Sequence, residues 1–248
     1  MKVAVSGAAG RMGSLVAAAV READDLDLGW LFDPSADRGD GVSADPEDVR
    51  GADVVVEFTM PGVVMANLER WRQMGIHAVV GTSGFTEARI DEVRRAWGSG
   101  PPNCLIAPNF SVGAVLMMRF AELAAPHFAA AEVIELHHDR KADAPSGTAV
   151  NTAARIAAAN PTQRRKVESE ELITGARGAT VEGVPVHGIR LPGLLAHQEV
   201  LLGNDGELLT IRHDTTDRAS FLTGVLLAVR HVASLPGVTV GIEGLLDI

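Results

Sequence analysis

The 248-residue chain predicts an α/β protein with a doubly wound parallel sheet and a central α+β domain whose sheet is mixed or antiparallel. Three observations support this prediction. Short apolar runs alternate with helical patterns up to residue 108, as in repeated β-α units. Runs such as Val54-Val55-Val56 are apolar on both faces, which is typical of strands that helices cover on both sides. After about residue 180, strand-like stretches separated by short turns favour an antiparallel or mixed sheet, and one of these turns, Asn204-Asp205-Gly206, carries the Asp-Gly signal of a hairpin.

The elements of the first part follow from the spacing of apolar residues and from the Gly, Pro and Asp residues between them. In chain order we predict a strand over Lys2–Ser6, a helix over Arg11–Glu22, strands over Leu26–Phe32 and Ala52–Thr59, a helix over Gly62–Met74, a strand over His77–Gly81, a helix over Thr86–Trp97 and a strand over Asn103–Pro108.

The remaining elements are predicted in the same way. They are a helix from Ser111 to about His127, a strand over Ala131–His138, a helix from Thr148 to about Asn160, strands over Gly183–Leu191, His197–Gly203 and Leu208–His213, a helix over Arg218–Ser234 and a strand over Val238–Ile242. The last strand matches the first half in pattern, so we expect it to join the first sheet. The predicted domains are therefore 1–108 with 219–248, and 109–218.

Composition and charge exclude several classes of function. The formal net charge is −10, which disfavours binding to nucleic acid and to anionic membrane surfaces. The single cysteine, Cys104, cannot form an internal disulfide, and no Cys/His spacing resembles a metal site. Met1-Lys2 leads directly into an apolar strand without the pattern of a cleavable leader. We therefore expect a cytoplasmic protein without a metal centre.

A glycine-rich loop joins the first predicted strand to the first helix. Gly7, Gly10 and Gly13 occur in the pattern G-x-x-G-x-x-G, at the position where a βα unit holds a pyrophosphate against a helix N-terminus. Alone this loop is also compatible with a structural turn. Asp33 follows about 20 residues later, at the end of the second strand, where an acidic side chain accepts hydrogen bonds from ribose hydroxyls. Together the two features predict a Rossmann-type domain that binds a nicotinamide dinucleotide.

Further polar segments follow strands of the same sheet. Two of them come at the carboxyl ends of predicted strands: Gly81-Thr82-Ser83-Gly84 and Ala107-Pro108-Asn109-Phe110. A third, Phe58-Thr59, ends the strand predicted over Ala52–Thr59. Open α/β sheets bind ligands at this edge, although each segment taken singly is compatible with a plain turn.

The densest polar segment runs from Glu135 to Thr148 and contains His137-His138, Lys141 and Ser146-Gly147. Ser146 is a candidate helix cap, which would leave the N–H groups of Gly147 and Thr148 for a carboxylate. Each feature alone fits a solvated strand end or loop. Their concentration in an acidic protein favours an anionic substrate that is protonated during the reaction.

These motifs resemble the dihydrodipicolinate reductase family. The resemblance covers nearly the whole chain and is carried by Gly7–Gly13, Phe58-Thr59, Gly81–Gly84 and Ala107–Ser111, and above all by His137-His138-x-x-Lys141-x-Asp143-Ala144-Pro145-Ser146-Gly147-Thr148. This last segment is specific to the family, whereas the glycine loop is not.

The resemblance implies a fold, an assembly and residue roles. Both chain ends would form the dinucleotide domain, and the central domain would bind the substrate and assemble a homotetramer. His137 and Lys141 would be proton donors, and His138, Gly147 and Thr148 would bind the substrate. The dinucleotide would be bound by Gly7, Ala8, Ala9, Gly10, Arg11, Met12, Asp33, Gly81, Thr82, Ser83, Ala107, Pro108, Asn109 and Phe110.

The implied reaction is the NADH- or NADPH-dependent reduction of a cyclic imine dicarboxylate, derived from 4-hydroxy-tetrahydrodipicolinate, in lysine and diaminopimelate biosynthesis. Members that use NADPH well often have arginine after the acidic residue, whereas Pro34 follows Asp33 here. This difference favours NADH, although Arg11 and Arg38 are candidates for contact with a 2′-phosphate.

Two other functions fit parts of the pattern. One is a two-domain nicotinamide-dependent reductase that acts on a different imine or carbonyl compound, which substrate profiling would distinguish. The other is a dinucleotide-sensing protein without catalysis, which would have no need of His137 and Lys141 beside an anion-binding helix start.

Overall fold

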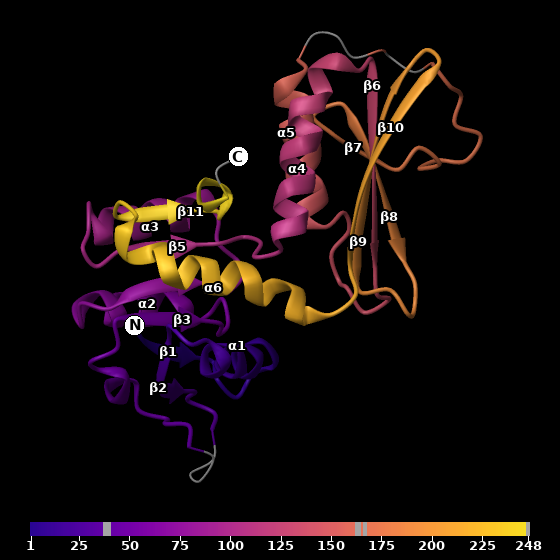
Figure 1. Ribbon diagram of the computed structural model, residues 1–248. Helices are drawn as coiled ribbons and strands as arrows, with labels where there is room; N and C mark the ends of the chain where they lie inside the picture. The colour runs from indigo at the N-terminus through magenta and orange to yellow at the C-terminus, as the bar shows by residue number, and fades with distance from the viewer. Residues whose placement is uncertain (37–40, 162–164, 166–167, 247–248) are drawn as a thin grey trace. The chain divides into compact units, whose positions relative to one another are not determined.

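The computed structural model describes residues 1–36, 41–161, 165 and 168–246. The chain forms two compact units, one of Met1–Val112 with Phe221–Ile248 and the other of Gly113–Ser220 (Figure 1). Within the first unit, the strand from near the C-terminus lies in the same sheet as the strands of the N-terminal part.

The first unit is built on a six-stranded sheet with the order β11-β5-β4-β3-β1-β2. Every neighbouring pair in it is parallel, as predicted, and β11 pairs with β5. The strands are β1 Lys2–Ser6, β2 Asp27–Phe32, β3 Val54–Glu57, β4 His77–Val80, β5 Cys104–Ile106 and β11 Val238–Val240.

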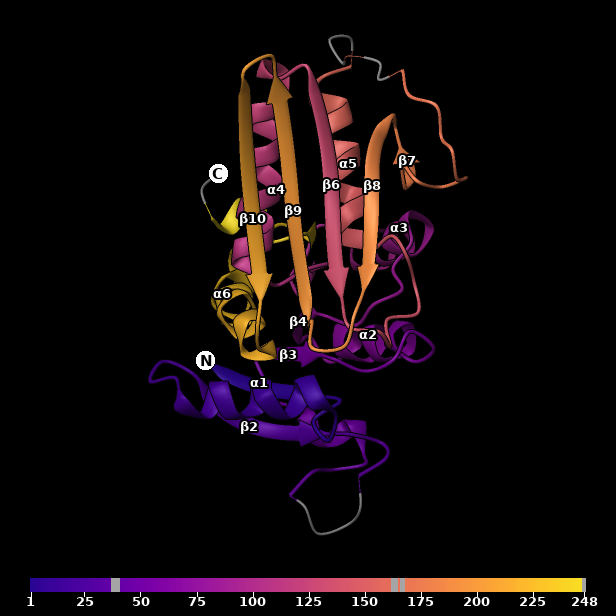
Figure 2. The same cartoon turned by 90° about the vertical axis from the view of Figure 1, so that its right-hand side faces the viewer.

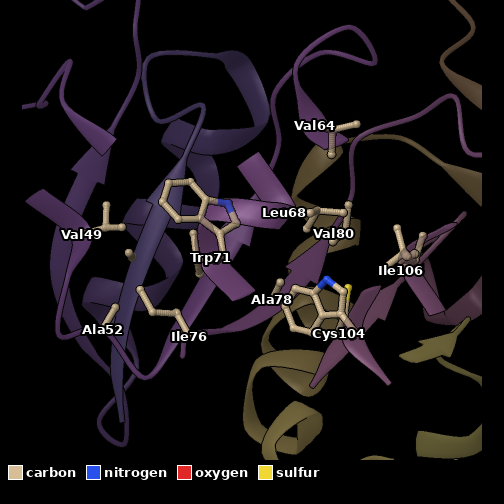
Figure 3. Packing of buried hydrophobic residues seen from close by; sticks show 14 of the residues in the cluster. Val49, Ala52, Val64, Leu68, Trp71, Ile76, Ala78, Val80, Cys104 and Ile106 are labelled. Atoms are coloured by element: carbon tan, nitrogen blue, oxygen red, sulfur yellow. The ribbon is translucent and has the colours of Figure 1, made fainter. Parts of the chain in front are cut away.

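Helices cover both faces of this sheet. They are α1 Arg11–Glu22, α2 Val64–Gln73, α3 Glu87–Trp97 and α6 Leu222–His231. Helix α1 contacts α6, and α2 contacts α3, as expected for two layers of helices. The layer of α2 and α3 packs Leu68, Trp71 and Trp97 against alternate strand residues such as Val55 and Ala78. Figure 3 shows Leu68, Trp71 and Ala78 in this cluster. Because strand side chains alternate between faces, the neighbouring buried valines Val54 and Val56 serve the opposite layer.

The second unit has a five-stranded sheet with the order β10-β9-β6-β8-β7. Only the β6–β8 pair is parallel among the pairings in the described part of this sheet, so the sheet is mixed, as predicted. Its elements are α4 Val112–Ala124, β6 Ala130–His137, α5 Gly147–Ala159, β7 Ala179–Val181, β8 Val184–Arg190, β9 Ala196–Asn204 and β10 Glu207–Thr215. Helices α4 and α5 lie along one face of the sheet (Figure 2).

Besides shifts of a few residues at the ends of elements, two differences from the predicted elements stand out. Strand β7 was not predicted; it pairs with β8 through a two-residue turn, in which Glu182 has φ 49° and Gly183 has φ 81°. The helix predicted over Arg218–Ser234 consists of a 3₁₀ turn over Arg218–Phe221, then α6, then a 3₁₀ turn over Val232–Ser234. In the described residues, none of the helices has the length and apolar character needed to cross a bilayer.

Candidate active site

The glycine loop of the first unit is closely packed. Gly7 has φ +82°, a conformation that favours glycine, and its amide N–H donates to the Phe32 carbonyl at 2.9 Å. A Cβ atom on Gly7 would lie 2.4 Å from the Phe58 carbonyl oxygen, and one on Gly13 would lie 2.0 Å from the Gly7 carbonyl oxygen. The loop therefore accepts no side chain at either position, which explains the first and third glycines of the pattern.

Helix α1 starts in a way that suits an anion. Its N-cap residue is Gly10, which supplies no side-chain acceptor, and its first turn contains no acidic residue. The first N–H groups of a helix lack partners within the helix and carry partial positive charge. This arrangement fits the pyrophosphate of a dinucleotide at Gly10, Arg11 and Met12.

Asp33 lies directly after β2 and is buried. Its Oδ2 accepts a hydrogen bond from the Ala9 amide at 3.1 Å, and its Oδ1 accepts from the amide and hydroxyl of Ser35 at 2.9 and 2.6 Å. A carboxylate has about four acceptor positions, so about one remains on Oδ2 beside the glycine loop. Asp33 thus fits one ribose hydroxyl of a dinucleotide. Arg38, the other candidate contact to a 2′-phosphate besides Arg11, lies outside the described residues.

Phe58 lies where the remaining predicted dinucleotide segments meet. A Cβ atom on Gly81 would lie 2.2 Å from the Phe58 ring, and this ring lies 5.8 Å from the Phe110 ring between centroids. The Thr82 hydroxyl donates to the Glu57 carbonyl at 3.3 Å, and the Gly81 amide donates to the same carbonyl at 3.0 Å. The segments Gly7–Met12, Gly81–Ser83 and Ala107–Phe110 therefore meet at one edge of the sheet, as expected for a dinucleotide site.

The buried side chain of Glu57 stabilises the Phe58-Thr59 turn at this edge of the sheet, and this role was not identified from the sequence. It is fully buried at the end of β3 and accepts hydrogen bonds from Thr59 Oγ1, from Trp71 Nε1 at 2.9 Å and from Asn67 Nδ2 at 3.3 Å. Both Asn67 and Trp71 belong to α2, so this carboxyl group ties the Phe58-Thr59 turn to the helix.

In the second unit, His137 is the last residue of β6 and has a fixed orientation. Its Nδ1 lies 2.6 Å from Glu135 Oε2, within hydrogen-bond distance, and only 15% of its side chain is exposed. Glu135 is fully buried and also accepts two hydrogen bonds from Arg190, at 2.8 Å each. Parallel pairing of β6 with β8 places Arg190 opposite His137.

Lys141 belongs to the same network. Its Nζ donates to Asp143 Oδ1 at 2.7 Å, and the Asp143 carbonyl accepts from Arg190 Nη2 at 2.6 Å. Arg190 thus connects the segment of Lys141 with the carboxylate that orients His137. The structure brings the two predicted proton donors into one cluster.

The start of α5 completes the cluster. Ser146 is the N-cap, as predicted, and its hydroxyl accepts from the Ala149 amide at 3.2 Å. A Cβ atom on Gly147 would meet nothing within 4 Å, so the space beside this residue is open. His138 Nδ1 is buried, and the described residues offer it no hydrogen-bond partner. A substrate carboxylate at the helix start fits the open space at Gly147.

The electrostatics of the cluster follow from burial and from its charges. Burial lowers the pKa of His137, against the opposing effect of the Glu135 carboxylate, while Lys141 and Arg190 lower it further. Burial raises the pKa of Glu135, but the hydrogen bonds from Arg190 and His137 outweigh it and hold that pKa below its ordinary value. Glu135 is therefore ionised, and His137 is a weaker base than free histidine.

Neither the role of Glu135 nor that of Arg190 was identified from the sequence. Glu135 begins the polar segment, but its contact with Arg190 joins residues 55 positions apart, and only the pairing of β6 with β8 reveals it. Among the described residues, three or more His, Cys, Asp or Glu side chains are nowhere grouped so that they could hold a metal ion.

A parallel sheet with a dinucleotide-type glycine loop, together with a second unit that brings the two predicted proton donors into one network with a helix start, is typical of a nicotinamide-dependent oxidoreductase. Comparisons with known proteins define it further. The family model for the N-terminus of dihydrodipicolinate reductase matches residues 1–110, and the model for its C-terminus matches residues 113–246. The chain belongs to the dihydrodipicolinate reductase family.

Individual relatives agree with this assignment. The chain is 55% identical over 250 residues to 4-hydroxy-tetrahydrodipicolinate reductase from Mycobacterium sp. (strain KMS), with all of both chains covered. It is 53% identical over 251 residues to the enzyme of that name from Mycolicibacterium gilvum (strain PYR-GCK), again over the whole of both chains. Among solved structures it resembles the dipicolinate-bound dihydrodipicolinate reductase from Paenisporosarcina sp. TG-14, with a TM-score of 0.84, 34% identity and 98% of each chain covered.

Proposed function

We propose that this chain is an NAD(P)H-dependent 4-hydroxy-tetrahydrodipicolinate reductase. It reduces the cyclic imine dicarboxylate derived from 4-hydroxy-tetrahydrodipicolinate to tetrahydrodipicolinate in lysine and diaminopimelate biosynthesis. Membership of the family supports this function. The observation that carries it is the cluster in which His137, fixed by Glu135, lies in one network with Lys141 and the start of α5.

The first unit is the dinucleotide-binding domain in this proposal. Gly10, Arg11 and Met12 hold the pyrophosphate at the N-terminus of α1, and Asp33 accepts a ribose hydroxyl. The segments Gly81–Ser83 and Ala107–Phe110 border the rest of the cofactor at the same edge of the sheet. When bound, NADH or NADPH supplies the hydride that the imine dicarboxylate accepts.

The second unit is the substrate-binding domain. The N–H groups of Gly147 and Thr148, together with the Thr148 hydroxyl, hold one substrate carboxylate at the start of α5, and His138 contacts the substrate through a ring nitrogen. Lys141 adds positive charge near this site, which favours an anionic substrate, while Arg190 is paired with Glu135. The structure of one relative was solved with bound dipicolinate, which, like the proposed substrate, is a ring that carries two carboxylates.

His137 and Lys141 deliver the proton that accompanies the hydride. Reduction adds one hydride and one proton to the conjugated imine, so the enamine formed by hydride addition takes a proton at carbon. His137 Nδ1 is bound to Glu135, which leaves Nε2 as the nitrogen that gives this proton. Bound substrate carboxylates favour the protonated form of His137 and so counteract the effect of burial on its pKa.

We also propose that the chain forms a homotetramer through the sheet of the second unit and works in the cytoplasm. Helices α4 and α5 lie along one face of that sheet (Figure 2). Strand β10 carries exposed large apolar side chains, Leu208 and Leu209, which favour contact with another protein surface. Sedimentation velocity at micromolar concentration tests the assembly, because a monomer would sediment as a 26.0 kDa particle.

The direct test of the function is the loss of nicotinamide absorbance with freshly made substrate. The preceding synthase generates 4-hydroxy-tetrahydrodipicolinate in the same cuvette, and the purified protein is added last. We expect one NADH to be consumed for each substrate molecule, and no consumption when the synthase is omitted. A pure, folded protein that consumes neither NADH nor NADPH under these conditions would refute the proposed function.

A further inference from the structure

We infer that Glu135 is a positioning residue that fixes the tautomer of His137 and ties this ring to the substrate-binding start of α5. The inference rests on the proposed function for the role of His137. It goes beyond that function because it assigns the buried carboxylate, with Arg190 as its partner, to proton delivery.

The hydrogen bonds of Glu135 are saturated. Oε2 accepts from His137 Nδ1 at 2.6 Å and from Arg190 Nη1 at 2.8 Å. Oε1 accepts from Arg190 Nη2 at 2.8 Å and from the Ser146 amide at 3.1 Å. A carboxylate offers about four acceptor positions, and here each is used. Glu135 therefore has no position left for a substrate or for a proton of its own and acts only through its neighbours.

The contact with His137 determines which ring nitrogen carries the proton in the neutral ring. An ionised carboxylate only accepts, so Nδ1 must donate, and Nε2 is the nitrogen that gains and loses a proton. Hydrogen bonds to a second group commonly set the tautomer and orientation of a functional histidine in this way.

The contact with Ser146 links proton delivery to substrate binding. Ser146 is the N-cap of α5, and Gly147 and Thr148 follow it as the first residues of the helix. One carboxylate thus fixes both the ring that gives the proton and the helix start that holds a substrate carboxylate. A shift of the His137 ring relative to the start of α5 would break one of these two hydrogen bonds to Glu135.

Arg190 explains how a carboxylate is tolerated beside a site for a dianion. Its two-pronged contact neutralises Glu135, so His137 receives a charged hydrogen-bond acceptor without a net negative charge that would repel the substrate. Space for the carboxylate comes from Gly188 on β8, where a Cβ atom would lie 3.1 Å from Glu135 Oε1. A buried ion pair contributes little to stability compared with apolar residues, so stability alone does not account for this pair.

The decisive variant is Glu135→Gln, which keeps the shape of the side chain and removes its charge. We expect kcat to fall at least about tenfold, and by up to about 10⁴-fold if the wrong tautomer becomes dominant. The dissociation constants of NADH and pyridine-2,6-dicarboxylate should change far less than kcat, because the amide oxygen of the substituted side chain can still accept from the Ser146 N–H at the start of α5. The groups acting on His137 are Glu135, Lys141 and Arg190, and only Glu135 raises its pKa. The limb where kcat/KM falls with rising pH should therefore move to lower pH.

Glu132→Gln is a matched control on the same strand. Glu132 also accepts from an arginine, Arg177, and from a histidine, His187, whose Nε2 lies 2.7 Å away. It takes no part in the cluster around His137. We expect this variant to keep the turnover and the pH profile of the wild type.

A measurement without catalysis separates this inference from the proposed function. Nitrogen-15 NMR of histidine-labelled wild-type protein, with His137→Gln for assignment, reports which ring nitrogen of His137 is protonated. We expect the proton on Nδ1 at a pH where the ring is neutral, even if the substrate has been assigned wrongly. A proton on Nε2 would overturn the inference, as would a folded Glu135→Gln variant with wild-type turnover and pH profile. Equal losses of turnover and dicarboxylate binding would also contradict it, since they indicate a structural role.

Discussion

Asp33 connects a single side chain with the choice of cofactor. Three donors from Ala9 and Ser35 already occupy its carboxylate, so it accepts about one further hydroxyl. A 2′-phosphate at that position would meet a buried negative charge instead. NADH should therefore be used at least as well as NADPH, in agreement with the absence of an arginine at position 34.

Asp33→Ala should raise the ratio of kcat/KM for NADPH to that for NADH, because the charge that repels the phosphate is removed. Steady-state titrations of both cofactors measure this ratio. Asp45→Ala is a suitable control, since Asp45 likewise accepts from the amide two residues further on but is not assigned to the dinucleotide. A wild type with strong NADPH preference that Asp33→Ala leaves unchanged would contradict the role of Asp33.

Thr148 tests the binding of the substrate carboxylate. Thr148→Val is nearly isosteric and removes the hydroxyl at the start of α5. We expect binding of pyridine-2,6-dicarboxylate to weaken by about 1–3 kcal/mol, the range for a lost hydrogen bond to a charged group. Calorimetry measures this change, and NADH binding should stay constant. The exposed residue Asn151, one turn further along the same helix, provides the control variant Asn151→Ala. Unchanged dicarboxylate affinity in Thr148→Val would disprove the assignment.

At the scale of elements, hydrophobic periodicity predicted the first unit well. Strand β1 and helix α1 begin and end where they were predicted, and the other predicted strands and helices differ at their ends by a few residues. Strands such as β3 are buried on both faces, so their apolar runs are distinct from the helical patterns between them. The Asp-Gly turn between β9 and β10 was also predicted, because Gly206 supplies the positive φ that the turn requires.

Contacts between distant segments could not be predicted in this way. Strand β7 was missed because its turn places Glu182 at a positive φ, a position where Asn, Asp or Gly would have been the recognisable signal. The Ser146 cap is local and was predicted from its position before a helix. The Glu135–Arg190 contact depends on strand pairing, and the buried acceptor role of Glu57 depends on the packing of α2.

Glu57 connects the turn after β3 with helix α2, so its substitution should lower the stability of the protein. Glu57→Gln would leave one of its three donors, from Thr59, Asn67 or Trp71, without a suitable acceptor inside the protein. The free energy of unfolding should fall by about 1–3 kcal/mol, the cost of leaving a buried polar group unsatisfied. Urea denaturation measures this change.

Glu47→Gln is the comparison for this substitution. Glu47 pairs with Arg50 at the surface with 58% of its side chain exposed, so its loss should cost at most about 1 kcal/mol. Because Glu57 holds the Phe58-Thr59 turn, Glu57→Gln should also weaken NADH binding and leave dicarboxylate binding unchanged. Equal stability of the Glu57→Gln protein and the wild type would show that Glu57 does not hold this turn.

At the scale of the whole molecule, the predicted site residues divide between the two compact units. Every residue assigned to the dinucleotide belongs to the unit of Met1–Val112 and Phe221–Ile248, and the residues assigned to the substrate and the proton belong to Gly113–Ser220. Binding of the cofactor and delivery of the proton should therefore respond to different substitutions.

The most direct test of the account combines turnover and NADH binding in one variant, His137→Gln. Loss of a positioned acid lowers turnover by roughly 10²–10⁴-fold, so we expect a decrease in this range, with NADH affinity by calorimetry equal to that of the wild type. Lys141→Ala should behave in the same way, and the double variant should lose less than the product of the two single losses, because the groups act together. A folded His137→Gln protein that retains near-normal turnover with freshly made substrate would contradict the assignment of His137 as the proton donor.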